Sequence, residues 1–121
     1  ELGLAIFGVR PINVLYDPYV GFKGDSPLFA KTVVNGREVY QTVPAKVGLF
    51  NLQQFPAAKT ANAFRVFSMG GSTTHGHPYD DRTSFSGWLR AFARAAEPSK
   101  DWQIVNCGGV SYASYREARM M

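Results

Sequence analysis

The spacing of hydrophobic positions changes near residue 60 and divides the chain into two parts. Before that point, prolines and glycines interrupt the apolar residues and leave short extended segments. The clearest of these are Phe29–Val34 and Arg37–Val43, which are separated by Asn35-Gly36. Because Asn-Gly tolerates a positive φ at both central positions of a tight turn, this region is predicted to form a β-hairpin.

After residue 60 the chain alternates short apolar segments with helical patterns. Phe64–Met69 is predicted to be a strand that ends at Gly70-Gly71, and Trp102–Asn106 a second strand that ends at Gly108-Gly109. Strands that alternate with helices over such distances favour βαβ units and a parallel sheet. A further helix is expected from Ser111 onward.

The helix between the two predicted strands has apolar residues at helical spacing, which predicts one buried stripe over about three to four turns. Its start offers three candidate caps, and Pro98 follows its end. The residues of the stripe are Phe85, Trp88, Leu89, Phe92, Ala93 and Ala96, and the candidate caps are Asp81, Thr83 and Ser84.

The composition is that of a folded chain and excludes several classes of function. The 121 residues leave room for one domain at most, and 45% of them are hydrophobic. The single cysteine, Cys107, excludes an internal disulfide framework and a cysteine-based zinc site. The net charge of +4 comes from lysines and arginines scattered along the chain, whereas nucleic-acid binding needs them clustered on one face. We therefore expect no nucleic-acid partner.

Neither end of the chain has the features of a natural terminus, so we expect a piece of a longer protein. The first residue is Glu1, followed by the apolar segment Leu2–Val9 and then Arg10. This segment fits either the end of a membrane anchor or signal sequence, or an amphipathic first helix or strand of the domain. The expected organisation is a leading or anchor segment over 1–12, a β-rich lead-in with the hairpin over 13–60, and the first part of an α/β domain over 61–121.

The segment Met69–Thr74 carries the most specific chemical signal. Ser72 lies just after a predicted strand, at the edge where ligands bind in open α/β sheets. The two glycines before it allow a sharp turn and the close approach of a ligand. A serine in this place can act as a nucleophile, and its own N–H can face a developing oxyanion. The alternative is a glycine turn in which Ser72 only caps the next helix.

A second glycine-rich loop, Gly108–Ser111, follows the second predicted strand. Two neighbouring loops that open toward one crevice form a better pocket than either loop alone. A backbone N–H of the second loop can also share the oxyanion with that of Ser72. In the alternative interpretation this loop is an ordinary connection from a strand to a helix.

These two loops and their strands resemble a known family, the SGNH (GDSL-type) hydrolases. Phe64–Thr74, with the sequence FRVFSMGGSTT, and Gln103–Arg116, with the sequence QIVNCGGVSYASYR, are similar to the first two conserved blocks of that family. The intervening PYDDRTSFSGWLRAF resembles one bacterial branch, and residues 15–56 resemble its lead-in segment. Members of that branch often follow an N-terminal membrane segment, and some carry tetratricopeptide repeats.

The resemblance implies a flavodoxin-like three-layer α/β/α fold with a parallel sheet, incomplete in this chain, and serine ester hydrolysis without a cofactor or metal. Ser72 matches the family's nucleophile, while Gly71 stands where many members have aspartate. The family's second oxyanion donor is a backbone N–H five residues after the strand-ending asparagine, which is Ser111 here, with Gly109 as the second choice. The remaining candidates for lining the pocket are Gly71, Thr73, His75 and Gly108.

The general base of the family lies in a late Asp-x-x-His, which this sequence does not contain. Residues 1–121 alone are therefore expected not to hydrolyse esters at an appreciable rate. His75, three residues after Ser72, is an alternative base, although a place at the pocket mouth suits it better. A metal site is suggested by His75, His77, Asp80 and Asp81, but the two aspartates are better explained as caps of the following helix.

The sequence thus predicts a serine ester hydrolase in the longer protein, acting on a small-molecule or carbohydrate ester. The resemblance adds a membrane-anchored or extracytoplasmic location in bacteria. Two alternatives stay open, namely acyl transfer to a cell-surface polysaccharide and a non-catalytic α/β module whose glycine loops serve only the fold. The deciding expectation is that the two loops meet in one cleft with the hydroxyl of Ser72 accessible.

Overall fold

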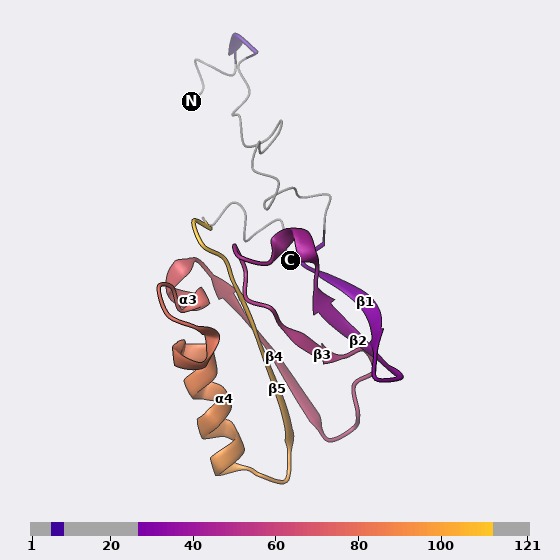
Figure 1. The fold of residues 1–121 in the computed structure, drawn as a ribbon. Helices are drawn as coiled ribbons and strands as arrows, with labels where there is room; N and C mark the ends of the chain where they lie inside the picture. The colour runs from indigo at the N-terminus through magenta and orange to yellow at the C-terminus, as the bar shows by residue number, and fades with distance from the viewer. Residues whose placement is uncertain (1–5, 9–26, 113–121) are drawn as a thin grey trace.

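The computed structural model describes residues 6–8 and 27–112, and its elements lie in layers. In Figure 1, α4 lies on one side of a parallel strand pair and a small antiparallel sheet lies on the other. The strands are β1 (Phe29–Val34), β2 (Arg37–Thr42), β3 (Gln54–Pro56), β4 (Ala63–Gly70) and β5 (Asp101–Gly108). The helical elements are η2 (Pro44–Lys46), α3 (Ser72–His75), η3 (Asp81–Thr83) and α4 (Phe85–Ala96).

The predicted hairpin is confirmed. β1 and β2 pair antiparallel, with Val34 opposite Arg37, so that Asn35 and Gly36 are the two central residues of the turn. Both have a positive φ, 50° and 74°, which is the conformation that the Asn-Gly pair predicts. β3, which was not predicted as a strand, adds to β2 and completes the antiparallel sheet in the order β1-β2-β3.

The predicted parallel pair is also confirmed. β4 and β5 run parallel in register, from Ala63 opposite Asp101 to Gly70 opposite Gly108. Side chains alternate between the two faces of the pair. One face packs on the antiparallel sheet, where Phe55, Val105 and Cys107 form a buried cluster. The other face carries α3 and α4, as Figure 1 shows.

The helix α4 forms over the predicted residues, but its apolar stripe is not buried, contrary to the prediction. Phe85, Trp88, Leu89 and Phe92 are exposed among the described residues, and Trp88 keeps 58% of its surface. The buried residues of the helix are instead Ser86 and Gly87. A Cβ at Gly87 would collide with the backbone of Asp81 and Arg82, so the smallest side chains set the closest approach. The periodicity located the helix correctly, but within the described residues the buried face is a different one.

The structure establishes mixed α/β content, with a two-stranded parallel and a three-stranded antiparallel sheet. In the described part, the second face of the parallel pair is covered by strands and not by the helices that an α/β/α arrangement has. Most of the expected leading segment 1–12 and the continuation of the helix expected after Ser111 lie outside the described residues. Within 6–8 and 27–112, no helix is long and apolar enough to cross a membrane.

Candidate functional site

The two glycine-rich loops lie side by side at the carboxyl ends of β4 and β5. The N–H of Gly109 donates to the carbonyl of Gly70 at 3.0 Å, which extends the strand pairing into the loops. A Cβ at Gly71 would collide with the carbonyl oxygen of Tyr112, so this glycine lets the second loop approach. The expected meeting of the two loops is therefore present in the structure.

Ser72 occupies the first position of α3, immediately after Gly71 ends the extended backbone of β4. The residue is exposed. The turn is closed behind it, since the carbonyl of Ser72 accepts from the N–H groups of Gly76 at 3.0 Å and His77 at 3.1 Å. Thr73, the next candidate for lining the pocket, is also exposed.

The two candidates for the second oxyanion donor differ in burial and in backbone conformation. Gly109 is buried, and its N–H is engaged with the carbonyl of Gly70. Ser111 is exposed at the rim of the same loop and has a φ of 58°. That value lies in the left-handed region that favours glycine, which is the usual residue of the resembled family at this position. Its exposed position and its backbone conformation therefore fit the donor role better than the buried position of Gly109 does.

His75 lies in the interior, with only 8% of its surface exposed. Burial lowers the pKa of its ring, the neighbouring His77 lowers it further, and Asp81 acts in the opposite direction. Its Nδ1 is buried and has no hydrogen-bond partner among the described residues. No hydrogen bond joins the ring to the hydroxyl of Ser72 in this part of the chain, so the geometry gives no support to His75 as the general base.

The two aspartates after the histidines have other partners than those expected. The side chain of Asp80 accepts from the N–H of Arg82 at 2.9 Å and so caps η3, while α4 is capped by Ser84, which accepts from the N–H of Gly87 at 3.1 Å. The expectation that the aspartates cap α4 is therefore wrong. Over the described ranges, no group of three histidine, cysteine or acidic side chains is placed to hold a metal ion.

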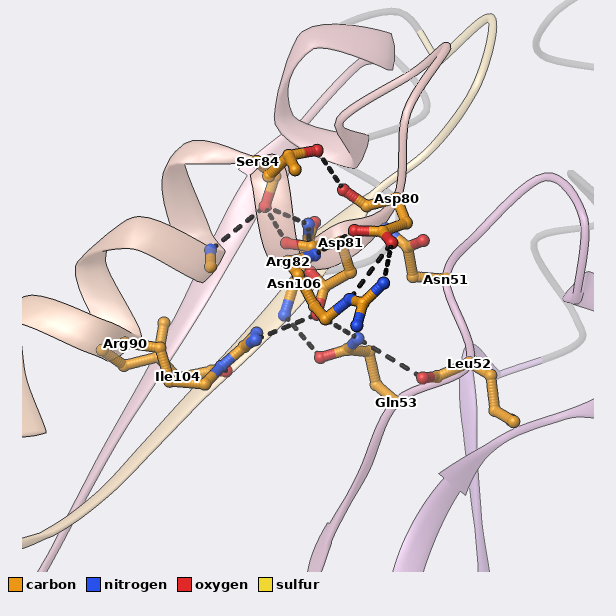
Figure 2. A network of polar contacts seen from close by, with 12 residues as sticks. Asn51, Leu52, Gln53, Asp80, Asp81, Arg82, Ser84, Arg90, Ile104 and Asn106 are labelled. Atoms are coloured by element: carbon orange, nitrogen blue, oxygen red, sulfur yellow. Dashed lines mark hydrogen bonds and ion pairs between the residues drawn. The ribbon is translucent and has the colours of Figure 1, made fainter.

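A buried polar network lies beneath the two loops, and sequence reasoning did not find it. Figure 2 shows Asn106, Asp81, Arg90 and Gln53 converging between α4, β5 and the segment before β3. Asp81 accepts from Asn106 Nδ2 at 2.8 Å, from Gln53 Nε2 at 3.2 Å and from the Arg90 guanidinium at 3.0 Å. Asp81 and Arg90 are largely buried, so this ion pair is less screened than the surface pairs.

The sequence signal for this network was weak. Asn106 ends a strand just before glycines, which also describes an ordinary turn residue. Asp81 stands before a helix, where capping is the common role. Their partners Gln53 and Arg90 are 28 and nine residues away from Asp81 in sequence, so only the tertiary structure brings the four together.

Cys107, at the end of β5, belongs to the core. Its thiol is 2% exposed, and burial raises its pKa to about 12. Because the thiolate is the nucleophilic form, this cysteine is chemically inert in the folded state. Burial and the raised pKa together give this sulfur the character of a core side chain.

A cleft of about 380 Å³ lies along the outer edge of β5, away from Ser72. It is lined by the first half of β5, by the segment before and within β3, and by Arg90 and Arg94 of α4. Neither glycine-rich loop contributes to it.

Comparison of the chain with known proteins adds no relative: no protein-family model, curated protein or solved structure matches it.

Proposed function

We propose that this chain supplies the nucleophile side of a serine ester hydrolase site. One observation carries the proposal: the exposed Ser72 follows β4 and lies beside the Gly108–Ser111 loop that follows the adjacent parallel strand β5. Ligands of open α/β sheets bind at this edge. The similarity of both loops to the SGNH blocks supports the same chemistry.

In the proposed reaction, Ser72 Oγ attacks the carbonyl carbon of an ester and its proton passes to a general base. The C–O bond to the alcohol then breaks, the alcohol leaves with a proton, and the acyl group stays on Ser72 as a new ester. Water, deprotonated by the same base, hydrolyses this ester and regenerates the serine. The N–H groups of Ser72 and Ser111 stabilise the oxyanion of both steps. The base belongs to the longer protein, since the described residues place none at Ser72.

We further propose that the parallel pair is part of a flavodoxin-like sheet that continues at the outer edge of β4. Backbone groups of a parallel strand point alternately to its two neighbours. Gly70 bonds to β5, so Arg65, Phe67 and Met69 direct their N–H and C=O groups outward, where no described residue pairs with them. The outer edge of β5 is different, because Arg90 donates to Ile104 O at 3.0 Å and Gln53 accepts from Asn106 N at 3.1 Å. The unpaired edge of β4 is therefore where a further strand fits.

The exposed apolar stripe of α4 also supports a further strand at the outer edge of β4. Arg90 and Arg94 lie toward the cleft at the outer edge of β5. Phe92 and Arg94 are separated by about 200° around the helix, so the apolar stripe lies on the other flank, above the β4 side. Phe64 of β4, on the helix-bearing face, is exposed as well. A helix that follows an added strand would cover these side chains.

The function is tested by labelling the longer protein with a fluorophosphonate probe. Attack of Ser72 Oγ on phosphorus displaces fluoride and leaves a covalent adduct, which peptide mass spectrometry locates. We expect the adduct on Ser72, its loss in Ser72→Ala, and unchanged labelling in Ser99→Ala, which removes an exposed hydroxyl remote from the loops. A folded longer protein without an adduct on Ser72 contradicts the proposed function and favours a non-catalytic module.

A second assay distinguishes hydrolysis from acyl transfer. The longer protein, not treated with the probe, is given p-nitrophenyl acetate with and without an oligosaccharide acceptor. Hydrolysis releases acetate and p-nitrophenol in equal amounts in both cases. If the acceptor instead takes up the acetyl group in place of water, the enzyme is an acyltransferase that uses the same Ser72 intermediate.

A further inference from the structure

The side chain of Asn106 lies at the centre of the polar network, with 1% of its surface exposed. Its Nδ2 has four oxygen atoms nearby, of which two are closest: Thr74 O and Asp81 Oδ1, both at 2.8 Å. An amide nitrogen has two hydrogens, so these two acceptors take both, and the oxygens of His75 and Ser84 at 3.4 and 3.2 Å are secondary.

The orientation of this carboxamide is fixed by its surroundings. Its Oδ1 accepts from the N–H of Gly108 at 2.9 Å. Rotation by half a turn would place the carbonyl oxygen against Thr74 O and Asp81 Oδ1, and the amide nitrogen against an N–H donor. The side chain therefore has one satisfied orientation, in which all its hydrogen-bonding groups are used inside the protein.

This orientation joins the two loops of the proposed site. Thr74 belongs to α3, which begins with Ser72, and Gly108 opens the loop that ends at Ser111. The contact is close, since a Cβ at Gly108 would collide with the backbone of Thr74 and His75. A second amide, Asn51 Nδ2, donates to His75 O at 2.8 Å from the lead-in side. Asn106 is the side chain that holds α3 and the Gly108 N–H at the same time.

We propose that Asn106 is a positioning residue for Ser72, with Asp81 fixing its orientation. Asp81 itself is held by Arg90 and Gln53, so the carboxylate stays aimed at Asn106 Nδ2 (Figure 2). The carboxamide thereby sets the separation between the Ser72 hydroxyl and the N–H groups of the second loop. A displacement of about 1 Å in such a separation lowers reaction rates by about a hundredfold. This proposal rests on the proposed function, and it assigns Asn106 no contact with the substrate.

The test compares Asn106→Ala with Asn62→Ala in the longer protein. Both substitutions remove an asparagine amide that donates to a backbone carbonyl, but Asn62 bonds to Ser99 O, at the opposite end of β4 from Ser72, and is no part of the network. The rate of Ser72 modification is measured as a function of fluorophosphonate concentration. We expect Asn106→Ala to lower the maximal rate of labelling at least tenfold. The probe concentration that gives half of the maximal rate should change little. Asn62→Ala should change neither quantity more than about threefold.

Hydrogen exchange supplies a readout that does not depend on reactivity. The N–H groups of His75, Gly76 and His77 close the α3 turn on Gly71 O and Ser72 O. In Asn106→Ala their exchange should accelerate at least tenfold while the β1–β2 hairpin is unchanged. If that variant does not fold, hydrogen exchange is measured in the wild-type protein instead. The side-chain amide protons of Asn106 and the backbone amides of the α3 turn should then exchange through an opening with the same free energy.

The outcomes separate the two proposals. Normal labelling kinetics in a folded Asn106→Ala protein, or equal losses in both variants, overturns the positioning role and leaves the function in place. Unequal opening free energies in the wild type also overturn it. Absence of Ser72 labelling in the wild type overturns the function, and the exchange measurements then decide alone whether Asn106 holds α3.

Discussion

At the residue scale, His75 makes stability depend on pH. Its neutral ring is buried, and burial together with His77 lowers its pKa below the ordinary value of 6.5. The unfolded chain therefore binds a proton at a higher pH than the folded protein does. The stability that comes from the neutral ring is complete above pH 6.5 and is lost as the pH falls through 6.5 toward the lower pKa of the folded state.

We therefore expect the free energy of unfolding to decrease below pH 6.5, with a slope of at most about 1.4 kcal/mol per pH unit from this group. Urea unfolding between pH 5 and 8 measures it. His75→Gln should remove most of this slope, whereas His77→Gln, at an exposed position, should keep most of it. An unchanged slope in His75→Gln means that another group is responsible.

At the scale of elements, Ser84 caps the start of α4. Its hydroxyl accepts from Gly87 N at 3.1 Å and donates to Asp81 O at 2.7 Å, and the residue is 3% exposed. Ser84→Ala is expected to lower the free energy of unfolding by about 1–2 kcal/mol, because it removes the cap and leaves Gly87 N–H unsatisfied. Thr83→Ala, which removes an exposed hydroxyl one residue earlier, should change it by less than about 0.5 kcal/mol. Chemical denaturation of both variants gives the comparison, and similar losses would contradict the capping role.

The same helix illustrates what the sequence predicts well and what it does not. Turn chemistry and apolar periodicity are local, so the Asn35-Gly36 hairpin, the strands β4 and β5 and the limits of α4 were predictable. Periodicity indicates which residues share a face, but not which neighbour that face meets, and α4 packs through Ser86 and Gly87 instead of its aromatic stripe. The placement of Ser72 beside the second loop followed from strand order alone. The Asn106 network did not, because it joins polar residues from segments far apart in sequence, each of which also fits a local role.

At the scale of the molecule, the two outer edges of the parallel pair β4–β5 differ within the described residues. On the β5 side, Arg90 and Gln53 pair with outward backbone groups of the strand. On the β4 side, an unpaired strand edge and an apolar helix flank occur together among the described residues. An open strand edge with exposed apolar neighbours favours association, and natural proteins normally cover such edges. The continued sheet proposed above covers both features with one added βα unit.

Substitutions on the two flanks of α4 test this continuation. Trp88 is 58% exposed in the described part, and an isolated surface position would tolerate Trp88→Ala with a change within about 0.5 kcal/mol. If an added helix covers the stripe in the longer protein, the same substitution removes a buried indole and should lower the free energy of unfolding by about 2–4 kcal/mol. Arg94→Ala, on the opposite flank, should stay within about 0.5 kcal/mol in either case. Denaturant unfolding of the longer protein therefore distinguishes the two structures. A small effect of Trp88→Ala on the stability of the longer protein would place the stripe in solvent and contradict a further strand beside β4. A loss of stability in Trp88→Ala but not in Arg94→Ala requires an element that covers the Trp88 flank.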